Sequence, residues 1–118
     1  MKKRDYRLFF NDILECANQI IKFTEKLSYE DFIADEMVIK AVERNFEIMG
    51  EAVKYIPDDV RERFNSISFR KIAGLRNILI HNYLGIDYEI MWEIIKNSLP
   101  ELITQTEIAL TELNKEME

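Results

Sequence analysis

The stretch YRLFFNDILECANQIIKFTEKL, residues 6–27, decides the fold class. Its apolar side chains recur at alternating intervals of three and four residues, which is the spacing of one face of an α-helix. They are Tyr6, Phe9, Ile13, Cys16, Ile20, Phe23 and Leu27. The stretch therefore predicts a long amphipathic helix whose apolar side is buried against other elements.

A helix-capping pattern follows this stretch. Ser28 with Asp31 three residues later resembles a capping box, so a second helix is expected to begin near Tyr29 or after a short break around Asp35. The apolar face expected for this helix consists of Val38, Ala41, Val42, Phe46, Met49, Val53 and Ile56. The pattern predicts a second long helix that packs against the first.

The middle of the chain predicts two further helices. Pro57 is followed by two aspartates, which is typical of a helix start because negative charge is favourable near the positive end of the helix dipole. A short third helix should end near Phe64 and lead into a turn. Ser68 can cap a fourth helix over residues 69–83, and Gly85 is well placed to end it.

Two more helices complete the predicted fold. Asp87 can cap a fifth helix that reaches about Ser98, and Pro100 opens the last one. The last helix carries on one side Leu102, Ile103, Thr106, Leu110 and Leu113. No stretch alternates with period two over a useful length, so no strand is expected. The sequence predicts an all-α antiparallel bundle of about five to six helices.

Length and composition indicate one globular domain, residues 1–118. Hydrophobic residues make up 47% of the 118, and no low-complexity tract, repeat or flexible linker interrupts the chain. The basic N-terminus leads neither into a signal-peptide core nor into an apolar run of about 20 residues that could span a membrane. We therefore expect a cytoplasmic protein without membrane contact.

Charge and cysteine content limit the possible partners. A formal net charge of −6 argues against a broad cationic surface for nucleic acid, although a local site for a short RNA segment is compatible with it. Cys16 is the single cysteine, so no intrachain disulfide is possible, and a small buried side chain is expected there. One histidine and no cysteine pair argue against a zinc site. Neither DNA nor a metal or other cofactor is expected.

The polar residues that can carry chemistry lie in GLRNILIHNY, residues 74–83. His81 is the only histidine, and histidine is the side chain whose charge ordinarily changes near neutral pH, so it is the obvious proton-transfer group. Asn77 lies four residues earlier on the same flank of the helix and can orient the ring. Arg76 falls inside the inward apolar arc on a wheel of about 100° per residue, so it needs a partner.

These residues fit RNA cleavage and also fit a structural role. Attack of a 2′-hydroxyl on the adjacent phosphate needs a base, an acid and a cation, of which one histidine and one arginine supply two. A second copy of the chain would supply the third. Five residues separate the two side chains by roughly 140° on an ideal helix, so their convergence needs a long reach or a distortion. Alternatively, His81 ends a helix and Arg76 pairs with a buried carboxylate such as Glu47 or Glu51, which spacing alone favours.

Other candidate residues have simpler interpretations. Glu47 and Glu51 lie one turn apart and could bind a cation, but such a pair more often forms a solvated face or, here, a counter-charge for Arg44 or for the arginine above. Tyr55 and Trp92 can stack on bases, although single aromatics on apolar helical faces usually pack inside. No glycine-rich phosphate loop occurs, so the chain is not itself a nucleotidyltransferase.

Three strings carry a resemblance to a known family. RNILIHNY, residues 76–83, has the Arg, four residues, His, one residue, Tyr pattern of the HEPN ribonucleases and more narrowly resembles the HepT toxins, formerly grouped as DUF86. RNFEIMGEA, residues 44–52, is similar to that family's second-helix signature. FRKIAGLRN, residues 69–77, and GID, residues 85–87, are similar to it as well. The resemblance covers most of the chain.

The resemblance implies an active site shared by two subunits. It implies a helical bundle that forms a homodimer, with the two motifs facing each other across a cleft. Arg76 and His81 would then be catalytic, Asn77 would support them, and no metal would be required. The implied activity is that of a metal-independent endoribonuclease, the toxin of a type VII toxin–antitoxin pair, acting on messenger or transfer RNA.

The resemblance also implies a partner and a modification. The family's antitoxin is an MntA-like minimal nucleotidyltransferase, which neutralises the toxin by AMPylation of the motif tyrosine, here Tyr83. Nucleotides two residues from His81 would add bulk and phosphate charge where the RNA backbone must lie. A core or interface aromatic is the alternative role for Tyr83. The alternative for the whole chain is a non-catalytic helical dimer that binds a nucleotidyltransferase partner or a nucleotide, as its acidic charge suggests.

Overall fold

The computed structural model describes residues 5–83 and 88–116, without the side chains of residues 80–83. In chain order the elements are α1 (Arg7–Thr24), α2 (Tyr29–Ala34), α3 (Glu36–Val53), α4 (Asp58–Arg63), α5 (Phe69–Ala73), α6 (Leu75–Tyr83), α7 (Tyr88–Glu93), the π-helix η1 (Ile94–Ser98) and α8 (Leu99–Glu116). No strand occurs in this part of the chain, so the predicted all-α class is confirmed.

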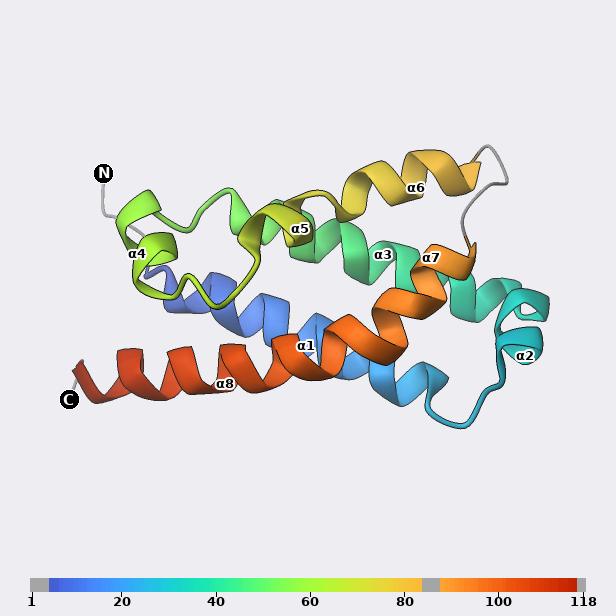
Figure 1. Ribbon diagram of the computed structural model, residues 1–118, viewed down its shortest axis with the longest axis horizontal. Helices are drawn as coiled ribbons and strands as arrows, with labels where there is room; N and C mark the ends of the chain where they lie inside the picture. The colour runs from blue at the N-terminus through green and yellow to red at the C-terminus, as the bar shows by residue number, and fades with distance from the viewer. Residues whose placement is uncertain (1–4, 84–87, 117–118) are drawn as a thin grey trace.

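Three long helices run side by side along the molecule, which measures 46 × 26 × 23 Å. Figure 1 shows α1 running opposite to both α3 and α8, and it packs against both of them. The short helices α5 and α6 cover α3 on its other side, and α2 and α4 close the two ends. The bundle is therefore antiparallel, as predicted. None of the helices described is long and apolar enough to cross a membrane.

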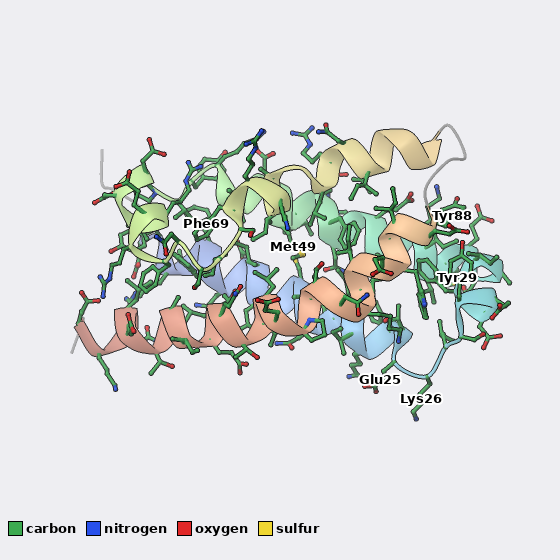
Figure 2. All side chains as sticks on the ribbon, viewed as in Figure 1. Glu25, Lys26, Tyr29, Met49, Phe69 and Tyr88 are labelled. Atoms are coloured by element: carbon green, nitrogen blue, oxygen red, sulfur yellow. The ribbon has the colours of Figure 1, made fainter. Side chains whose placement is uncertain are left out.

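The core lies between α1, α3 and α8. Phe10, Phe46 and Met49 are completely buried, and Phe10 meets the rings of Phe64 and Phe69 edge to face at 5.8 and 5.9 Å. Figure 2 shows Met49 and Phe69 within the bundle, whereas the side chains of the turn after α1 extend into solvent. The apolar stripe predicted for residues 6–27 is confirmed at its four central members, Phe9, Ile13, Cys16 and Ile20, which are buried. Phe23, also predicted to be on this stripe, is 42% exposed, so the prediction is wrong there.

Capping explains how the chain turns from α1 into α3. The Asp31 N–H donates to Ser28 Oγ at 3.1 Å, and the Ser28 N–H donates to Asp31 Oδ2 at 3.3 Å, which completes a capping box. Asp35 Oδ1 then accepts from the Val38 N–H at 3.2 Å and caps α3. Both expected helix starts, near Tyr29 and after Asp35, are therefore used.

Most of the apolar face predicted for α3 is confirmed, although the buried side of the helix is rotated slightly from the predicted one. Five of its seven residues are buried, namely Val42, Phe46, Met49, Val53 and Ile56. Val38 and Ala41 are only half-buried, and Ile39 and Ala52 are buried in addition. The buried Asn45 donates from Nδ2 to the Ala41 carbonyl at 2.9 Å, so its amide is not left without a partner.

The prediction of one continuous fourth helix over residues 69–83 is wrong, because this segment forms two helices. The chain breaks at Gly74, where the Asn77 N–H donates to the Gly74 carbonyl at 3.0 Å in a tightened turn, so that α5 and α6 each pack on α3. The hydroxyl of Ser68 makes no capping hydrogen bond to α5. The predicted stop at Gly85 and cap at Asp87 lie outside the described residues.

The expected boundary between the last two helices, near Ser98 and Pro100, is confirmed, but no break in the chain separates them. The chain continues from α7 through η1 into α8, and the Leu99 N–H donates to the Ile94 carbonyl five residues back. Proline has no N–H and its ring crowds the carbonyl four residues earlier in an α-helix. The wider π-turn just before Pro100 accommodates this, and Figure 1 shows the chain changing direction there.

Candidate functional site

One exposed face of α3 forms the floor of the candidate site. At helical intervals of three and four residues it presents Arg44, Glu47, Ile48, Glu51, Ala52 and Tyr55. Arg44 Nη1 bonds to Glu47 Oε1 at 2.8 Å, and Lys54 Nζ bonds to Glu51 Oε2 at 3.1 Å. Charged and aromatic side chains therefore line up along one helix, and they face α6.

Arg76 lies in the first turn of α6 and extends over this floor. Its side chain is 51% exposed, and its Nη1 lies 3.6 Å from Glu51 Oε2. The predicted inward position of Arg76 is therefore wrong. Arg76 lies at the edge of the inward arc, so its aliphatic part passes over Gly50 of α3 while its guanidinium reaches solvent. The inward residues of this segment are Ile72 and Leu75.

Gly50 determines how closely α6 approaches α3. A Cβ atom at this position would lie 3.2 Å from Arg76 Cγ and 3.4 Å from the Ile72 carbonyl oxygen. Glycine therefore lets the aliphatic part of Arg76 pass directly over the α3 backbone. In the sequence this glycine stands out only as part of a family string, because its role in packing depends on how closely α6 lies on α3.

Glu51, one of the two carboxylates named in the structural alternative, is the counter-charge of Arg76, but it is half exposed and not buried. Its Oε2 lies 3.1 Å from Lys54 Nζ and 3.6 Å from Arg76 Nη1. Both partners of each pair are about half exposed, so water competes with the ion pairs and they add little to stability. Arg76 is thus held near α3 while its guanidinium stays accessible to another anion.

Two hollows open on either side of Arg76. The first, about 270 Å³, is bordered by Arg44, Glu47, Glu51, Asp12, Phe9 and Tyr55, among others. The second, about 420 Å³, is bordered by Glu47, Lys54, Ala73, Asn77 and Leu79. Arg76 and Asn77, both predicted site residues, therefore share one surface depression. A larger hollow, about 590 Å³ against η1 and α8, is bordered by neither Arg76 nor Asn77.

The other predicted site residues follow on α6. His81 and Tyr83 belong to the helical backbone of α6, but their side chains lie outside the described residues. Asn77 is exposed and precedes His81 by one helical turn. The structure thus places Arg76 and Asn77 at the hollows and leaves the expected positions of the His81 and Tyr83 side chains as predictions.

The two aromatic residues considered for base stacking differ in their surroundings. Trp92 packs against Phe32 at 5.2 Å and Tyr29 at 6.0 Å between ring centroids, with Lys96 over its ring. Tyr55 is 57% exposed and lies at the edge of the first hollow. The expectation that such aromatics pack inside therefore fits Trp92, which is half-buried, and is wrong for Tyr55.

Cys16 lies on the core side of α1. Its thiol is buried, as predicted, and burial together with nearby carboxylates, Asp12 first among them, raises its pKa to about 11. A thiol with so high a pKa is a poor nucleophile near neutral pH. Among the described residues no group of three or more His, Cys, Asp and Glu side chains is placed to hold a metal ion.

Comparison with known proteins places this chain among named relatives. The family profile "Ribonuclease HepT-like" matches residues 13–108. "Putative RNase MJ1380" of Methanocaldococcus jannaschii is 47% identical over 108 residues, which is 92% of this chain and 99% of that protein. "Putative RNase MJ0127" of the same organism is 40% identical over 118 residues, 100% and 98% of the two chains. "Probable ribonuclease HepT" of Thermococcus cleftensis is 38% identical over 100 residues, 85% and 91% of the two chains. No solved structure matches.

Proposed function

The chain belongs to the HepT-like ribonuclease family, and from this we propose that it is a metal-independent endoribonuclease that cuts RNA through Arg76 and His81. The observation that carries the proposal is the position of Arg76. This arginine is half exposed and borders two hollows, and among the described residues the carboxylate of Glu51 lies 3.6 Å from its guanidinium. A planar guanidinium in that setting can bind the phosphate at the cleavage point.

The proposed reaction uses three groups around one phosphate. A base removes the proton from the 2′-hydroxyl, and the 2′-oxygen attacks the adjacent phosphorus. The bond to the 5′-oxygen breaks, and an acid gives that leaving oxygen a proton, which leaves a 2′,3′-cyclic phosphate and a 5′-hydroxyl. Arg76 stabilises the charge that develops on the phosphoryl oxygens. His81 moves a proton, and Asn77 holds the imidazole in orientation from one turn away.

The requirement for both a base and an acid supports a homodimer. The chain has one histidine, so a second copy would bring the second proton-transfer group. On one helix the directions of Arg76 and His81 differ by roughly 140°, which also favours a phosphate that lies between groups from two chains. We therefore place the active site at a two-fold interface that contains α6 of both subunits.

We further propose that this ribonuclease is the toxin of a toxin–antitoxin pair in the cytoplasm. Its targets would be messenger or transfer RNA, and an MntA-like nucleotidyltransferase would silence it by transferring AMP to Tyr83. Phosphate charge attached two residues from His81 would repel the RNA backbone and occupy its space. Wild type should lose RNA cleavage after this reaction, whereas Tyr83→Phe should neither gain AMP nor lose activity.

A second candidate function is favoured by the formal net charge of −6. Such a charge opposes RNA binding over a wide surface. On this alternative the chain is a non-catalytic helical dimer that binds a nucleotidyltransferase or a nucleotide. The cleavage experiment below separates the two candidates.

The test is RNA cleavage by the purified full-length protein in EDTA. Mass spectrometry first establishes that Tyr83 is unmodified. Arg76→Ala and His81→Ala should each lose at least about 100-fold in rate, the usual contribution of a positioned proton donor or an electrostatic group. Arg63→Ala is the matched control, because Arg63 is also an exposed, carboxylate-paired arginine but lies on α4. Intact RNA with folded wild type would favour the docking dimer.

A further inference from the structure

Tyr55 is an exposed aromatic ring fixed from one side. It follows the last turn of α3, and its ring stacks on that of Phe9 with centroids 5.0 Å apart and an angle of 20° between the planes. Phe9 is buried at 8% exposure and belongs to the core, whereas Tyr55 is 57% exposed. The Tyr55 ring is thus held by a rigid neighbour while much of its surface remains free.

Arg76 borders the same hollow as this ring. The hollow of about 270 Å³ extends from Tyr55 along α3, past Ala52 and Ile48, to Arg44. Its walls therefore combine an aromatic ring, small apolar side chains and two guanidinium groups. Aromatic rings beside arginines are the combination with which proteins bind single-stranded RNA bases.

We propose that this hollow is a nucleobase subsite, in which a base of single-stranded RNA adjacent to the cleaved phosphodiester stacks on Tyr55. The proposal rests on the proposed function, because Arg76 marks the position of the phosphate. Tyr55 is then a substrate-positioning residue. It fixes the nucleotide next to the bond that breaks.

The charges in the hollow favour a base over a phosphate as its occupant. Besides the two arginines, three carboxylates line it, those of Asp12, Glu47 and Glu51. A dianion or a run of phosphates would be repelled by these carboxylates. A neutral base is not repelled, and its amino groups can donate to carboxylate oxygens. The base would enter the hollow while its phosphate stays at the rim, near Arg76.

The subsite also selects for unpaired RNA. In a duplex the faces of each base are covered by its neighbours, and the major groove of A-form RNA is too deep and narrow for side chains to read. A single strand can turn one base out and stack it on an aromatic ring. We therefore expect the enzyme to cut loops and unpaired segments.

The experiment measures binding without cleavage. The probe is a short single-stranded RNA in which every 2′-hydroxyl is methylated, so that attack on the phosphate is blocked. A series of otherwise identical probes lacks one base each. Wild type, Tyr55→Phe, Tyr55→Leu and Phe23→Leu are compared. Phe23 is the matched control, because it is an exposed aromatic on α1 about 21 Å along the helix from Phe9.

Tyr55→Leu should weaken binding of the intact probe by about 5- to 100-fold, the range of one base stack, while Tyr55→Phe and Phe23→Leu should bind like wild type. Removal of one particular base from the probe should weaken its binding to wild type by a similar factor. The same removal should not further weaken its binding to Tyr55→Leu. If removal of a base weakens binding to wild type and to Tyr55→Leu equally, the subsite proposal is overturned. So would the absence of binding by wild type, or conversion of a dimer into monomers by Tyr55→Leu.

Failure of the subsite and failure of the ribonuclease function are separable. If wild type cleaves unmodified RNA and Tyr55→Leu cleaves it with unchanged KM, the subsite is wrong and the ribonuclease stands. Suppose that removal of one base weakens binding of the methylated probe to wild type but not to Tyr55→Leu, and that wild type never cleaves RNA. The subsite then stands as a binding site, and the ribonuclease proposal fails.

Discussion

The helix pair α1–α3 and the shorter helix α6 are built in opposite ways. α1 is covered on two sides, by α3 and α8, and buries seven of its residues from Phe9 to Thr24. α6 lies on the outside of the bundle, and its first turns expose Arg76 and Asn77 and leave Ile78 and Leu79 half-buried. Stability should therefore come mainly from the first region and chemistry from the second.

α3 supports the exposed site with the side that faces away from the core. Glu51, Lys54 and Tyr55, which border the hollows, belong to the end of α3 and the turn after it, on the side away from the core. One helix thus serves both regions, with its inner face in the core and its outer face under Arg76. Changes to the inner face should alter folding, and changes to the outer face should alter function.

The largest expected effect is on the core side. Phe10→Ala should lower the free energy of unfolding by about 3 to 5 kcal/mol, because Phe10 is fully buried and touches two further rings. Ile78→Ala on α6 should cost clearly less, since Ile78 is half-buried. Urea denaturation of both variants measures the contrast. Equal losses would contradict the division into a core region and a site region.

Cys16 provides a second contrast. With its pKa raised from 9.0 to about 11, the native thiol should react with a disulfide reagent at pH 8 about 100-fold more slowly than in urea. Between pH 9 and 11 the unfolded chain loses the thiol proton before the folded chain does, so stability should fall as the pH rises. Cys16→Ala should remove that part of the pH dependence. Fast labelling of the native protein would show that α1 opens easily.

Gly50 lies where the two regions meet, so a larger residue there should affect both. Gly50→Leu should destabilise the fold by about 1 to 3 kcal/mol through overpacking and should displace Arg76. The matched change Gly74→Leu should cost less, because a Cβ there would have only ordinary contacts, 3.4 Å from two carbonyl oxygens. Unfolding and cleavage measured on both variants test this. Cleavage unchanged in Gly50→Leu would contradict the packing role of Gly50 toward Arg76.

The smallest effect is expected at a surface ion pair that joins α4 to the end of α8. Arg63 bonds to Glu116 at 2.9 and 2.6 Å and lowers the pKa of that carboxyl. The ion pair contributes its full stability above the ordinary carboxyl pKa, and this contribution disappears as the pH falls through the lowered pKa of Glu116. Arg63→Ala should therefore lower Tm slightly at pH 7 and by less at pH 3. A large loss at either pH would show that the end of α8 matters more than its exposure indicates.

Much of the fold could be predicted because the deciding signals are local. The apolar interval of three and four residues fixes which side of α1 is buried, and the hydroxyl and carboxylate of Ser28 and Asp31 cap α2 whatever surrounds them. Pro100 likewise marked the boundary before the last helix, but the break at Gly74 and the π-turn that joins η1 to α8 without interruption could not be placed in this way. A helical wheel assumes one regular helix and does not show where its geometry changes.

The candidate site was predicted only in part. Arg76, Asn77 and the pairing of Glu51 with Arg76 were identified from the sequence, and the structure brings these residues together on one surface. The exposure of Arg76 and Tyr55 was not foreseen. The spacing of Arg44, Glu47, Glu51 and Tyr55 along α3 was the available signal, since it describes one polar stripe opposite the apolar one.

By itself the sequence determined the helical class, the apolar stripes and the resemblance of its Arg–His–Tyr string to a ribonuclease family. Those properties depend on the order and spacing of residues within a few turns. Only the tertiary structure decided that Arg76 faces outward, that Gly50 lets it lie across α3, and that Tyr55 stacks on Phe9 beside a hollow. Spacing sets the faces of a helix, but which face is covered depends on how closely another helix can approach it.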